Sequence, residues 1–412
     1  MAKRLLPTTK TQVSGHRFMR RRVEHGLLFG DVRMIHDPLG ARRRASIFGL
    51  VSALMIAGVM GLFAWMRPNP DPGDAPILRT ADGALYVRVG ETAHPVTNLT
   101  SARLVAGVAA NPERAGEQFV AALPRGVPVG IVAAPGLFAS ADSAADSWSA
   151  CATADAVIVR AGEAPSPLPP DRAVLAALDG REWIVTREGR TELPPQDSKE
   201  GRMLRRGLAI DANTPRWSPL PQVLGALREL PPYEFPPTMP VLESGADSWL
   251  LVGEAVAPIT ELQKRLLIDA GSQPRPTNPA ELASRPDASP PLDLRLPATA
   301  PDWLDPGTQA VCAGPTGEGA VMERDAALAG AIELSGDTVA THFAGLAAGA
   351  VGVDSGHGYH VVSPAGLRHP VADAETLAVI GVARTDEVRW ELVSLLPEGE
   401  ALTRDAALRA LY

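Results

Sequence analysis

The sequence predicts an α+β fold in which one transmembrane helix anchors a large extracytoplasmic domain. Residues 45–66 form an uncharged, mostly apolar run, and a helix needs about 20 such residues to cross a bilayer. Beyond this run, four diverged segments each combine two short β-type strands, a turn and a helical stretch. Extended apolar runs between these segments, at 127–134, 156–159 and 350–353, predict strands of a β-rich core.

A basic arm, residues 1–44, precedes the apolar run. It holds eleven Lys and Arg residues against three acidic ones, so the positive-inside rule places it in the cytoplasm. A cleavable signal peptide is the alternative, but its apolar core would be about 7–15 residues long and nearer the N-terminus. We therefore expect a single-pass membrane protein whose bulk lies outside the cytoplasm.

The arm is expected to contain a basic amphipathic helix. Apolar positions there alternate with Arg residues at roughly helical spacing. The helix is expected to end at Asp37-Pro38, because the residue before a proline avoids helical geometry. Such a helix can lie on anionic lipid or bind a protein partner.

Small residues recur every four positions along the apolar run, at Gly49, Ala53, Ala57 and Gly61. They line one narrow stripe that would let another helix approach closely. The alternative is that Gly and Ala are simply frequent in membrane helices.

The two cysteines, Cys151 and Cys312, both follow the apolar run. Disulfides form outside the cytoplasm and free thiols are unusual there, so we predict that the two pair. Two buried, reduced thiols are the alternative. With a net charge of +8 on the arm and −8 on the whole chain, the exported residues carry −16, which argues against nucleic acid as a partner.

Three of the four repeat segments share a glycine turn followed by a proline, and the second has the weakest turn. The predicted repeat-turn residues are Gly90, Pro95, Gly253, Pro258, Gly366 and Pro370. A Leu-Pro phrase recurs at Leu123-Pro124, Leu230-Pro231 and Leu396-Pro397, and we interpret it as strands and turns of the central core. The irregular spacing of the segments disfavours a simple solenoid.

These patterns divide the chain into a membrane anchor and an alternation of repeats with core segments. The predicted parts are the arm 1–44, transmembrane helix 45–66, linker 67–76, first repeat 77–123, core 124–178, second repeat 179–213, core and linker 214–244, third repeat 245–272, Pro-rich linker 273–310, core 311–356, fourth repeat 357–383 and core 384–412.

Motifs that carry chemistry are missing from the sequence. A phosphate loop needs a Gly-rich turn ending in Lys and Ser or Thr, whereas the Gly-rich stretches 314–319 and 345–358 lack the lysine and are interpreted as β-turns. His357 and His360 are the closest pair of exported histidines, yet residues three apart on a strand face opposite sides. We therefore expect no catalytic residue, no cofactor and no metal site.

Six exported tryptophans could stack on cell-wall sugars, although burial in a core is the commoner fate of this side chain. They are Trp148, Trp183, Trp217, Trp249, Trp303 and Trp390.

Several long phrases strongly resemble EccB, a core membrane component of the actinobacterial type VII secretion system. In order they are residues 12–18, 21–25, 30–39, 74–77, 83–87, 94–96 and 98–104, the two cysteines, and 395–399. Phrases of this length, in the same order around the same topology, are more specific than any short motif.

The resemblance implies a structural subunit that scaffolds and gates the periplasmic side of a protein-export pore. It implies an elongated periplasmic domain on a protein of the inner (plasma) membrane, with four repeat modules like those of phage wall-binding subunits and a Cys151–Cys312 bridge. It also implies self-association, and partners of the EccC ATPase, EccD, EccE and mycosin types. It favours a protein partner for the arm helix, docked through Phe18, Arg21, Arg22, Val23 and Leu27. A peptidoglycan-binding anchor is the alternative function; the ATPase activity attributed to some members comes third.

Overall fold

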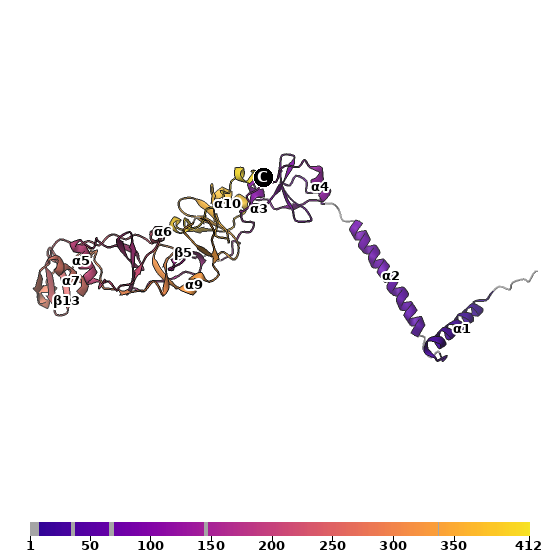
Figure 1. The fold of residues 1–412 in the computed structure, drawn as a ribbon, viewed down its shortest axis with the longest axis horizontal. Helices are drawn as coiled ribbons and strands as arrows, with labels where there is room; N and C mark the ends of the chain where they lie inside the picture. The colour runs from indigo at the N-terminus through magenta and orange to yellow at the C-terminus, as the bar shows by residue number, and fades with distance from the viewer. Residues whose placement is uncertain (1–7, 34–37, 66–69, 144–146, 337) are drawn as a thin grey trace, which may run out of the picture. The chain divides into compact units, whose positions relative to one another are not determined.

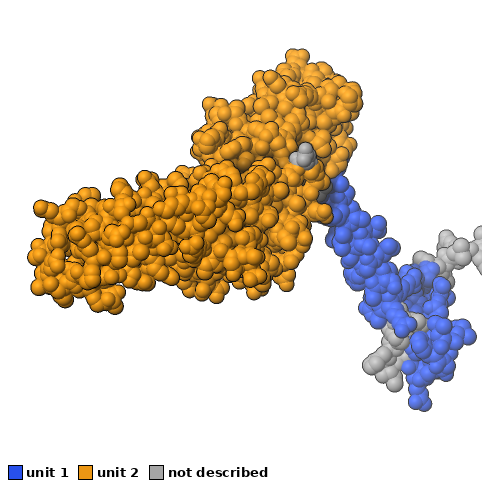
Figure 2. All heavy atoms as spheres, turned by 60° about the vertical axis from the view of Figure 1, so that its left-hand side comes forward, with its two compact units in different colours: residues 1–70 blue, residues 71–412 orange. Residues whose placement is uncertain are grey.

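A computed structural model describes residues 8–33, 38–65, 70–143, 147–336 and 338–412. The chain divides into two compact units (Figure 2): unit 1 comprises residues 1–70 and unit 2 residues 71–412.

The first helix of unit 1, α1 (Lys10–Phe29), begins with a capping box formed by Thr9 and Gln12. It ends at Gly30, which adopts the left-handed conformation with φ 70°, a geometry that glycine enters without steric cost. The predicted end at Asp37-Pro38 is therefore wrong, because Gly30 terminates the helix earlier; Asp37 lies outside the described residues.

The second helix, α2 (Pro38–Trp65), contains the apolar run. Residues Ala41–Trp65 are long and apolar enough to cross a membrane. The helix starts earlier than the predicted residue 45, because proline is well suited to the first helical position. Arg42, Arg43 and Arg44 consequently belong to the helix itself. The predicted last residue, Met66, lies outside the described residues.

A seven-stranded sheet forms the core of unit 2, in the order β19-β20-β6-β5-β17-β18-β7. Its strands come from two stretches of chain. They are β5 (Ser147–Ala152), β6 (Val157–Gly162), β7 (Ser166–Pro167), β17 (Gln309–Ala313), β18 (Gly319–Glu323), β19 (Ile332–Glu333) and β20 (His342–Gly345). The short helix α9 (Arg324–Leu328) follows β18.

Four smaller sheets share one strand order, third-second-first-fourth, with antiparallel pairing except for a parallel fourth strand. The first contains β1 (Ile77–Arg79), β2 (Leu85–Val89), β3 (Thr92–Val96) and β4 (Glu113–Arg114). The second contains β8 (Arg172–Leu178), β9 (Arg181–Thr186), β10 (Gly189–Glu192) and β11 (Arg216–Trp217), with β16 (Asp302–Trp303) paired to β8. The third contains β12 (Val241–Ser244), β13 (Asp247–Val252), β14 (Ala255–Ile259) and β15 (Pro274–Pro276). The fourth contains β21 (Val351–Asp354), β22 (Tyr359–Val362), β23 (Arg368–Val371) and β24 (Thr385–Glu387).

A helix joins the third strand of each small sheet to the fourth, and a shorter helix follows the fourth strand. The first set is α3 (Leu99–Ala106), α5 (Lys199–Gly207), α7 (Glu261–Ala270) and α10 (Ala374–Ile380). The second set is α4 (Glu117–Ala122), α6 (Pro221–Ala226), α8 (Pro279–Ala283) and α11 (Trp390–Val393), and α12 (Arg404–Ala407) lies near the chain end. We name the four sheets with their helices modules 1 (77–129), 2 (172–230), 3 (241–288) and 4 (351–402).

After each shorter helix, the chain runs parallel to the third strand of its own module. The bridges are Ala93 to Arg125, Arg190 to Glu229, Val256 to Asp287 and Arg368 to Glu398. The three Leu-Pro phrases lie in these covering segments. The interpretation of the phrases as strands of the central core is thus wrong, since each one covers an otherwise open strand edge of a module.

Only one of the three predicted core strands belongs to the central sheet. Run 156–159 overlaps β6, whereas run 350–353 overlaps β21, the first strand of module 4. Run 127–134 forms no strand and bridges β3 through Val129 instead. Runs 156–159 and 350–353 are buried, whereas Val127 and Val132 of the first run are exposed. Apolar composition therefore does not select the sheet in which a segment pairs.

The modules pack in two pairs. Modules 1 and 4 share an apolar core that includes Val87, Leu104, Val361 and Ile380, and modules 2 and 3 share another that includes Leu204 and Leu266. Figure 1 shows α3 beside α10 and α5 beside α7, and contacts between these helices agree.

Candidate interaction sites

The two cysteines lie opposite each other on neighbouring strands of the central sheet. Cys151 on β5 pairs in register with Cys312 on β17, and the structure joins them in a disulfide. Both residues are fully buried. The bond closes a loop that holds modules 2 and 3 entirely, whereas modules 1 and 4 lie outside it.

Candidate centres for metal chemistry are absent from the described ranges: no three His, Cys, Asp or Glu side chains gather there closely enough to hold an ion. His357 and His360 both lie near the ring of Trp390. The premise that they alternate along one strand is wrong, because His357 precedes β22 (Tyr359–Val362); His360 is buried and His357 exposed.

His360 belongs to an aromatic and charged cluster in module 4. Its ring stacks on Trp390 with centroids 5.6 Å apart, and the Arg368 guanidinium lies 5.0 Å from the centroid of the same ring. Arg368 also pairs with Glu398 of the covering segment at 2.7 Å. Burial, together with the charge of Arg368, lowers the pKa of His360, and Glu398 opposes this shift.

Two other histidines occupy the same position in modules 1 and 4. His94 bonds through Nδ1 to Val127 O at 3.0 Å, and His369 bonds through Nδ1 to Glu400 O at 2.8 Å. Each ring lies against a glycine of its covering segment, Gly126 or Gly399, where a Cβ would come within 2.6 Å of ring atoms. These histidines therefore fasten the covering segments to the modules.

His369 is the more enclosed of the two. The residue is fully buried and its Nε2 has no hydrogen-bond partner. Burial lowers the pKa of His369, opposed by the hydrogen bond to the Glu400 backbone oxygen. The neutral form is therefore favoured in the folded protein.

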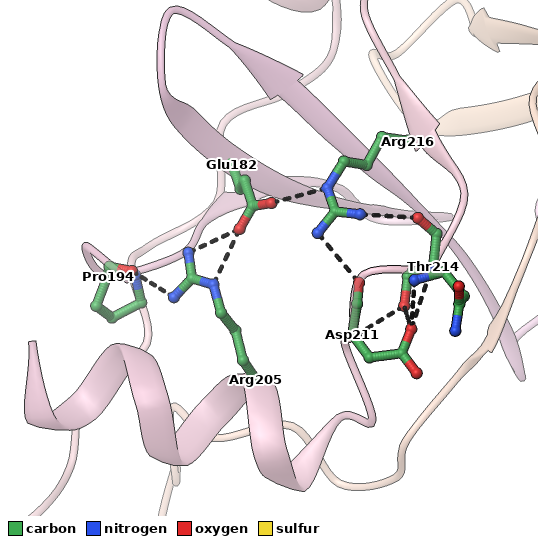
Figure 3. Close-up of polar contacts among 7 residues, drawn as sticks. Glu182, Pro194, Arg205, Asp211, Thr214 and Arg216 are labelled. Atoms are coloured by element: carbon green, nitrogen blue, oxygen red, sulfur yellow. Dashed lines mark hydrogen bonds and ion pairs between the residues drawn. The ribbon is translucent and has the colours of Figure 1, made fainter. Parts of the chain in front are cut away.

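Module 2 uses an ionic clamp (Figure 3). Glu182 on β9 accepts hydrogen bonds from Arg205 on α5 at 2.9 Å and from Arg216 on β11 at 3.2 Å. Arg205 Nη1 donates to Pro194 O, and Arg216 donates to the backbone oxygens of Thr214 and Asp211. The Glu182 carboxylate thus links α5 to the strands β9 and β11.

A second polar group, formed by Trp148, Arg384 and Asp386, links the central sheet to module 4. Trp148 on β5 donates through Nε1 to Asp386 Oδ2 at 3.1 Å, and Arg384 donates to both oxygens of the same carboxylate at 2.8 Å. The sequence analysis missed this group and the Glu182 clamp. Their members lie up to 238 residues apart, so no local pattern could have brought them together.

The predicted repeat-turn residues separate into two classes. Gly90, Gly253 and Gly366 lie in turns with positive φ, a conformation that favours glycine. The three prolines lie within strands instead, in β3, β14 and β23. These are the third strands, at the edges of their sheets, where a missing N–H donor is tolerated.

The tryptophans offer few open faces in unit 2. Trp148, Trp183 and Trp217 are buried in the core. Trp390 is contacted by His360 and Arg368, and Trp303 donates to Leu208 O. Trp249 is half-buried.

The residues singled out in unit 1 are exposed. Phe18, Val23 and Leu27 leave more than half of their surface open, and Arg21 and Arg22 are exposed beside them on α1. On α2, the small residues Gly49, Ala53, Ala57 and Gly61 are exposed along its length.

Residues 5–246 match a family model described as the type VII secretion system ESX-1, transport TM domain B, or EccB. The chain is 30% identical to the "ESX-1 secretion system ATPase EccB1" of Mycobacterium tuberculosis, over 97% of this chain and 94% of the relative. It is 29% identical to the "ESX-3 secretion system ATPase EccB3" of Mycolicibacterium smegmatis, over 98% and 90%.

Two solved structures share the fold. One is a chain of an intact ESX-5 inner membrane complex, with a TM-score of 0.65 and 24% identity over 99% of this chain and 96% of that chain. The other is the EccB3 dimer from the ESX-3 core complex, with a TM-score of 0.65 and 22% identity over 81% and 100%.

Proposed function

Because this chain belongs to the EccB family of type VII secretion subunits, we propose that it is a structural subunit of a type VII inner-membrane complex. Unit 2 scaffolds the periplasmic side of the export pore and takes part in gating it. The observation that carries the proposal is the family match together with one apolar helix and a disulfide-bearing β domain.

The proposed orientation places the arm in the cytoplasm and unit 2 in the periplasm. The excess of Lys and Arg before α2 supports it through the positive-inside rule. The disulfide supports it independently, since such bonds persist in oxidising compartments.

The proposed partners are the EccC, EccD, EccE and mycosin types of subunit and further copies of this chain. On the cytoplasmic side, α1 docks through the exposed side chains of Phe18, Arg21, Arg22, Val23 and Leu27. Within the membrane, the small-residue stripe of α2 packs against another helix, because residues without bulky side chains let backbones approach closely.

The stripe has a direct test. Ala57→Leu would place a bulky side chain in the middle of it, whereas Leu54→Ala changes a bulky residue outside the stripe. We expect Ala57→Leu to reduce recovery of the complex and Leu54→Ala to leave it unchanged, with both variants inserted in the membrane. Equal recovery would remove the stripe from the proposal.

Peptidoglycan anchoring and ATP hydrolysis receive less support. A sugar platform uses open aromatic faces, and three of the tryptophans of unit 2 are buried while two more make the contacts described above. The relatives are named ATPases, but this sequence lacks the Gly-rich loop ending in Lys and Ser or Thr that binds phosphates.

The deciding experiment is purification of the chain through a C-terminal tag after mild detergent extraction. Size measurement and mass spectrometry then identify its companions. Elution in a large particle with an ATPase and a multi-span subunit supports the scaffold role. Elution alone, or only with cell-wall fragments, would replace that role with wall anchoring.

A further inference from the structure

Residues 397–412, named the C-terminal strap, connect module 4 with module 1. At one end, Gly399 N and Leu402 N donate hydrogen bonds to backbone oxygens of β23 at 2.9 and 2.8 Å. At the other end, Leu411 N donates to Pro128 O at 3.1 Å, in the segment that covers module 1. The strap therefore joins the edges of two modules that also share an apolar core.

A histidine fastens the chain at each end of the strap. On module 4, His369 Nδ1 lies 2.8 Å from Glu400 O of the strap. On module 1, His94 Nδ1 lies 3.0 Å from Val127 O, one residue before the attachment point of the strap. A carbonyl oxygen only accepts, so Nδ1 carries the hydrogen in both rings. In the neutral form, Nε2 is then a bare acceptor.

The two rings differ in their access to water. His369 is fully buried, and its Nε2 has no hydrogen-bond partner among the described residues. A proton added there would place a charge in the interior together with an N–H group that lacks an acceptor, and both are costly. His94 is partly exposed, so water can hydrate a charge on its ring.

Charged groups near His369 compensate for such a charge only weakly. Glu400 favours the charged ring, but its carboxylate is exposed and pairs with Arg409 at 3.1 Å. Arg368 precedes His369 on β23, and its positive charge is paired with Glu398 of the strap at 2.7 Å. Both carboxylates of the strap are thus engaged with arginines near the surface rather than with the buried ring.

The remaining neighbours supply no further charge to the buried ring. Segment 127–137, which lies against the end of the strap, contains no ionisable residue, and the two charged residues of α12 are exposed. His360 on the adjacent strand β22 pairs with Pro370, so its side chain lies on the opposite face from His369. Burial therefore lowers the pKa of His369. Since the ring binds a proton more readily once it is released, acid favours release of the strap.

We propose that the C-terminal strap is an acid-sensitive connection between modules 1 and 4, in which protonation of the His369 ring releases residues 397–402 from β23. The end held by module 1 stays attached. Release would expose Leu402, which is fully buried, and would leave the outer edge of β23 unpaired, an edge that another strand can join. The inference does not depend on the scaffold role, and its failure would leave that role unchanged.

Hydrogen exchange in the full chain tests the release, measured in detergent at about pH 7.5 and about pH 5.5, on either side of the ordinary histidine pKa. Each rate is divided by the intrinsic exchange rate at the same pH. We expect protection of the peptide that contains Gly399 and Leu402 to fall roughly tenfold or more in acid. The internal control is Leu230 of module 2, whose N–H donates to Arg190 O at 2.8 Å and whose module has Thr191 in place of the histidine. Protection of Leu230 should be unchanged.

Two variants separate titration of His369 from other effects of acid. His369→Gln removes the titrating ring, so the acid-induced loss of protection in the strap should disappear, whereas it should persist in the matched control His94→Gln. Glu400→Gln removes an exposed carboxylate that favours the charged ring, so it should shift release to lower pH, and it keeps the test decisive if His369→Gln does not fold. Undiminished protection of the wild-type strap in acid, an equal loss at Leu230, an acid-induced loss in folded His369→Gln, or an unshifted midpoint in Glu400→Gln would each overturn the proposal.

Discussion

Modules 1 and 4 have the same strand order as modules 2 and 3, yet different interactions hold the two pairs. In modules 1 and 4 a histidine fastens the covering segment through a glycine contact. The matching position in module 2 is Thr191, and in module 3 it is Ala257. In module 2 the ion pair of Arg190 with Glu229 at 3.0 Å joins the covering segment to the third strand, and the Glu182 clamp links the helix to the strands. One topology therefore tolerates quite different side-chain solutions.

The two pairs of modules also differ in their position relative to the disulfide. The disulfide closes the chain around modules 2 and 3 and leaves modules 1 and 4 outside. Modules 1 and 4 are joined across the pair by packing and by hydrogen bonds such as Arg103 Nη1 to Ile380 O at 2.8 Å. Substitutions in each pair and a change of pH can test this contrast.

Removal of the disulfide should affect the enclosed pair most. Cys151→Ala with Cys312→Ala is expected to lower the free energy of unfolding by about 2–5 kcal/mol, because the unfolded chain gains conformational freedom. Chemical denaturation measures the loss, and limited proteolysis should show new cleavage between residues 152 and 311. First cleavage in modules 1 or 4 would contradict the contrast.

Loss of the Glu182 carboxylate should destabilise module 2. Glu182→Gln leaves Arg205 partly buried without its counter-charge, and breaking such a pair costs about 2–4 kcal/mol. Glu229→Gln, which breaks a pair whose carboxylate is 66% exposed, should cost under about 1 kcal/mol. Equal midpoints of denaturation for the two variants would argue against the clamp.

Gly399 and Gly126, which lie against His369 and His94, should differ in how much stability the protein loses when a methyl group is added. Gly399→Ala pushes against His369, which is fully buried, and should cost about 1–3 kcal/mol through overpacking. Gly126→Ala meets His94, which is half-exposed and can turn toward solvent, so its cost should be lower. Adding His369→Ala should recover part of the stability of Gly399→Ala; no recovery would refute the contact as the cause.

Acidification should weaken module 4 before module 2. The pKa values of His360 and His369 are lowered in the folded protein, so the unfolded chain binds more protons as the pH falls below about 6.5. Their contribution to stability is complete above that pH and is lost as the pH falls toward the folded-state values. His369→Gln should flatten the dependence of melting temperature on pH between about 7 and 5; an unchanged slope would exclude His369 as its source.

Much of the local structure was predictable from sequence. The glycine turns at Gly90, Gly253 and Gly366 and the apolar helix follow from backbone sterics and hydropathy alone. The error at Asp37-Pro38 also has a local cause, because Gly30 is an earlier stop signal in the sequence. The prolines were predicted as repeat-turn residues, whereas they lie in the third strands, at the outer edges that face the covering segments.

Composition, hydropathy and long local phrases are sufficient to predict the family, the membrane anchor, the α+β class and the two cysteines. The folded structure was needed to show that the Leu-Pro phrases cover module edges, that Glu182 joins two arginines, and that the disulfide encloses modules 2 and 3. Strand pairing and ion pairing join residues that are distant in the chain. Their partners are selected by burial and geometry in the folded state, which local sequence patterns do not record.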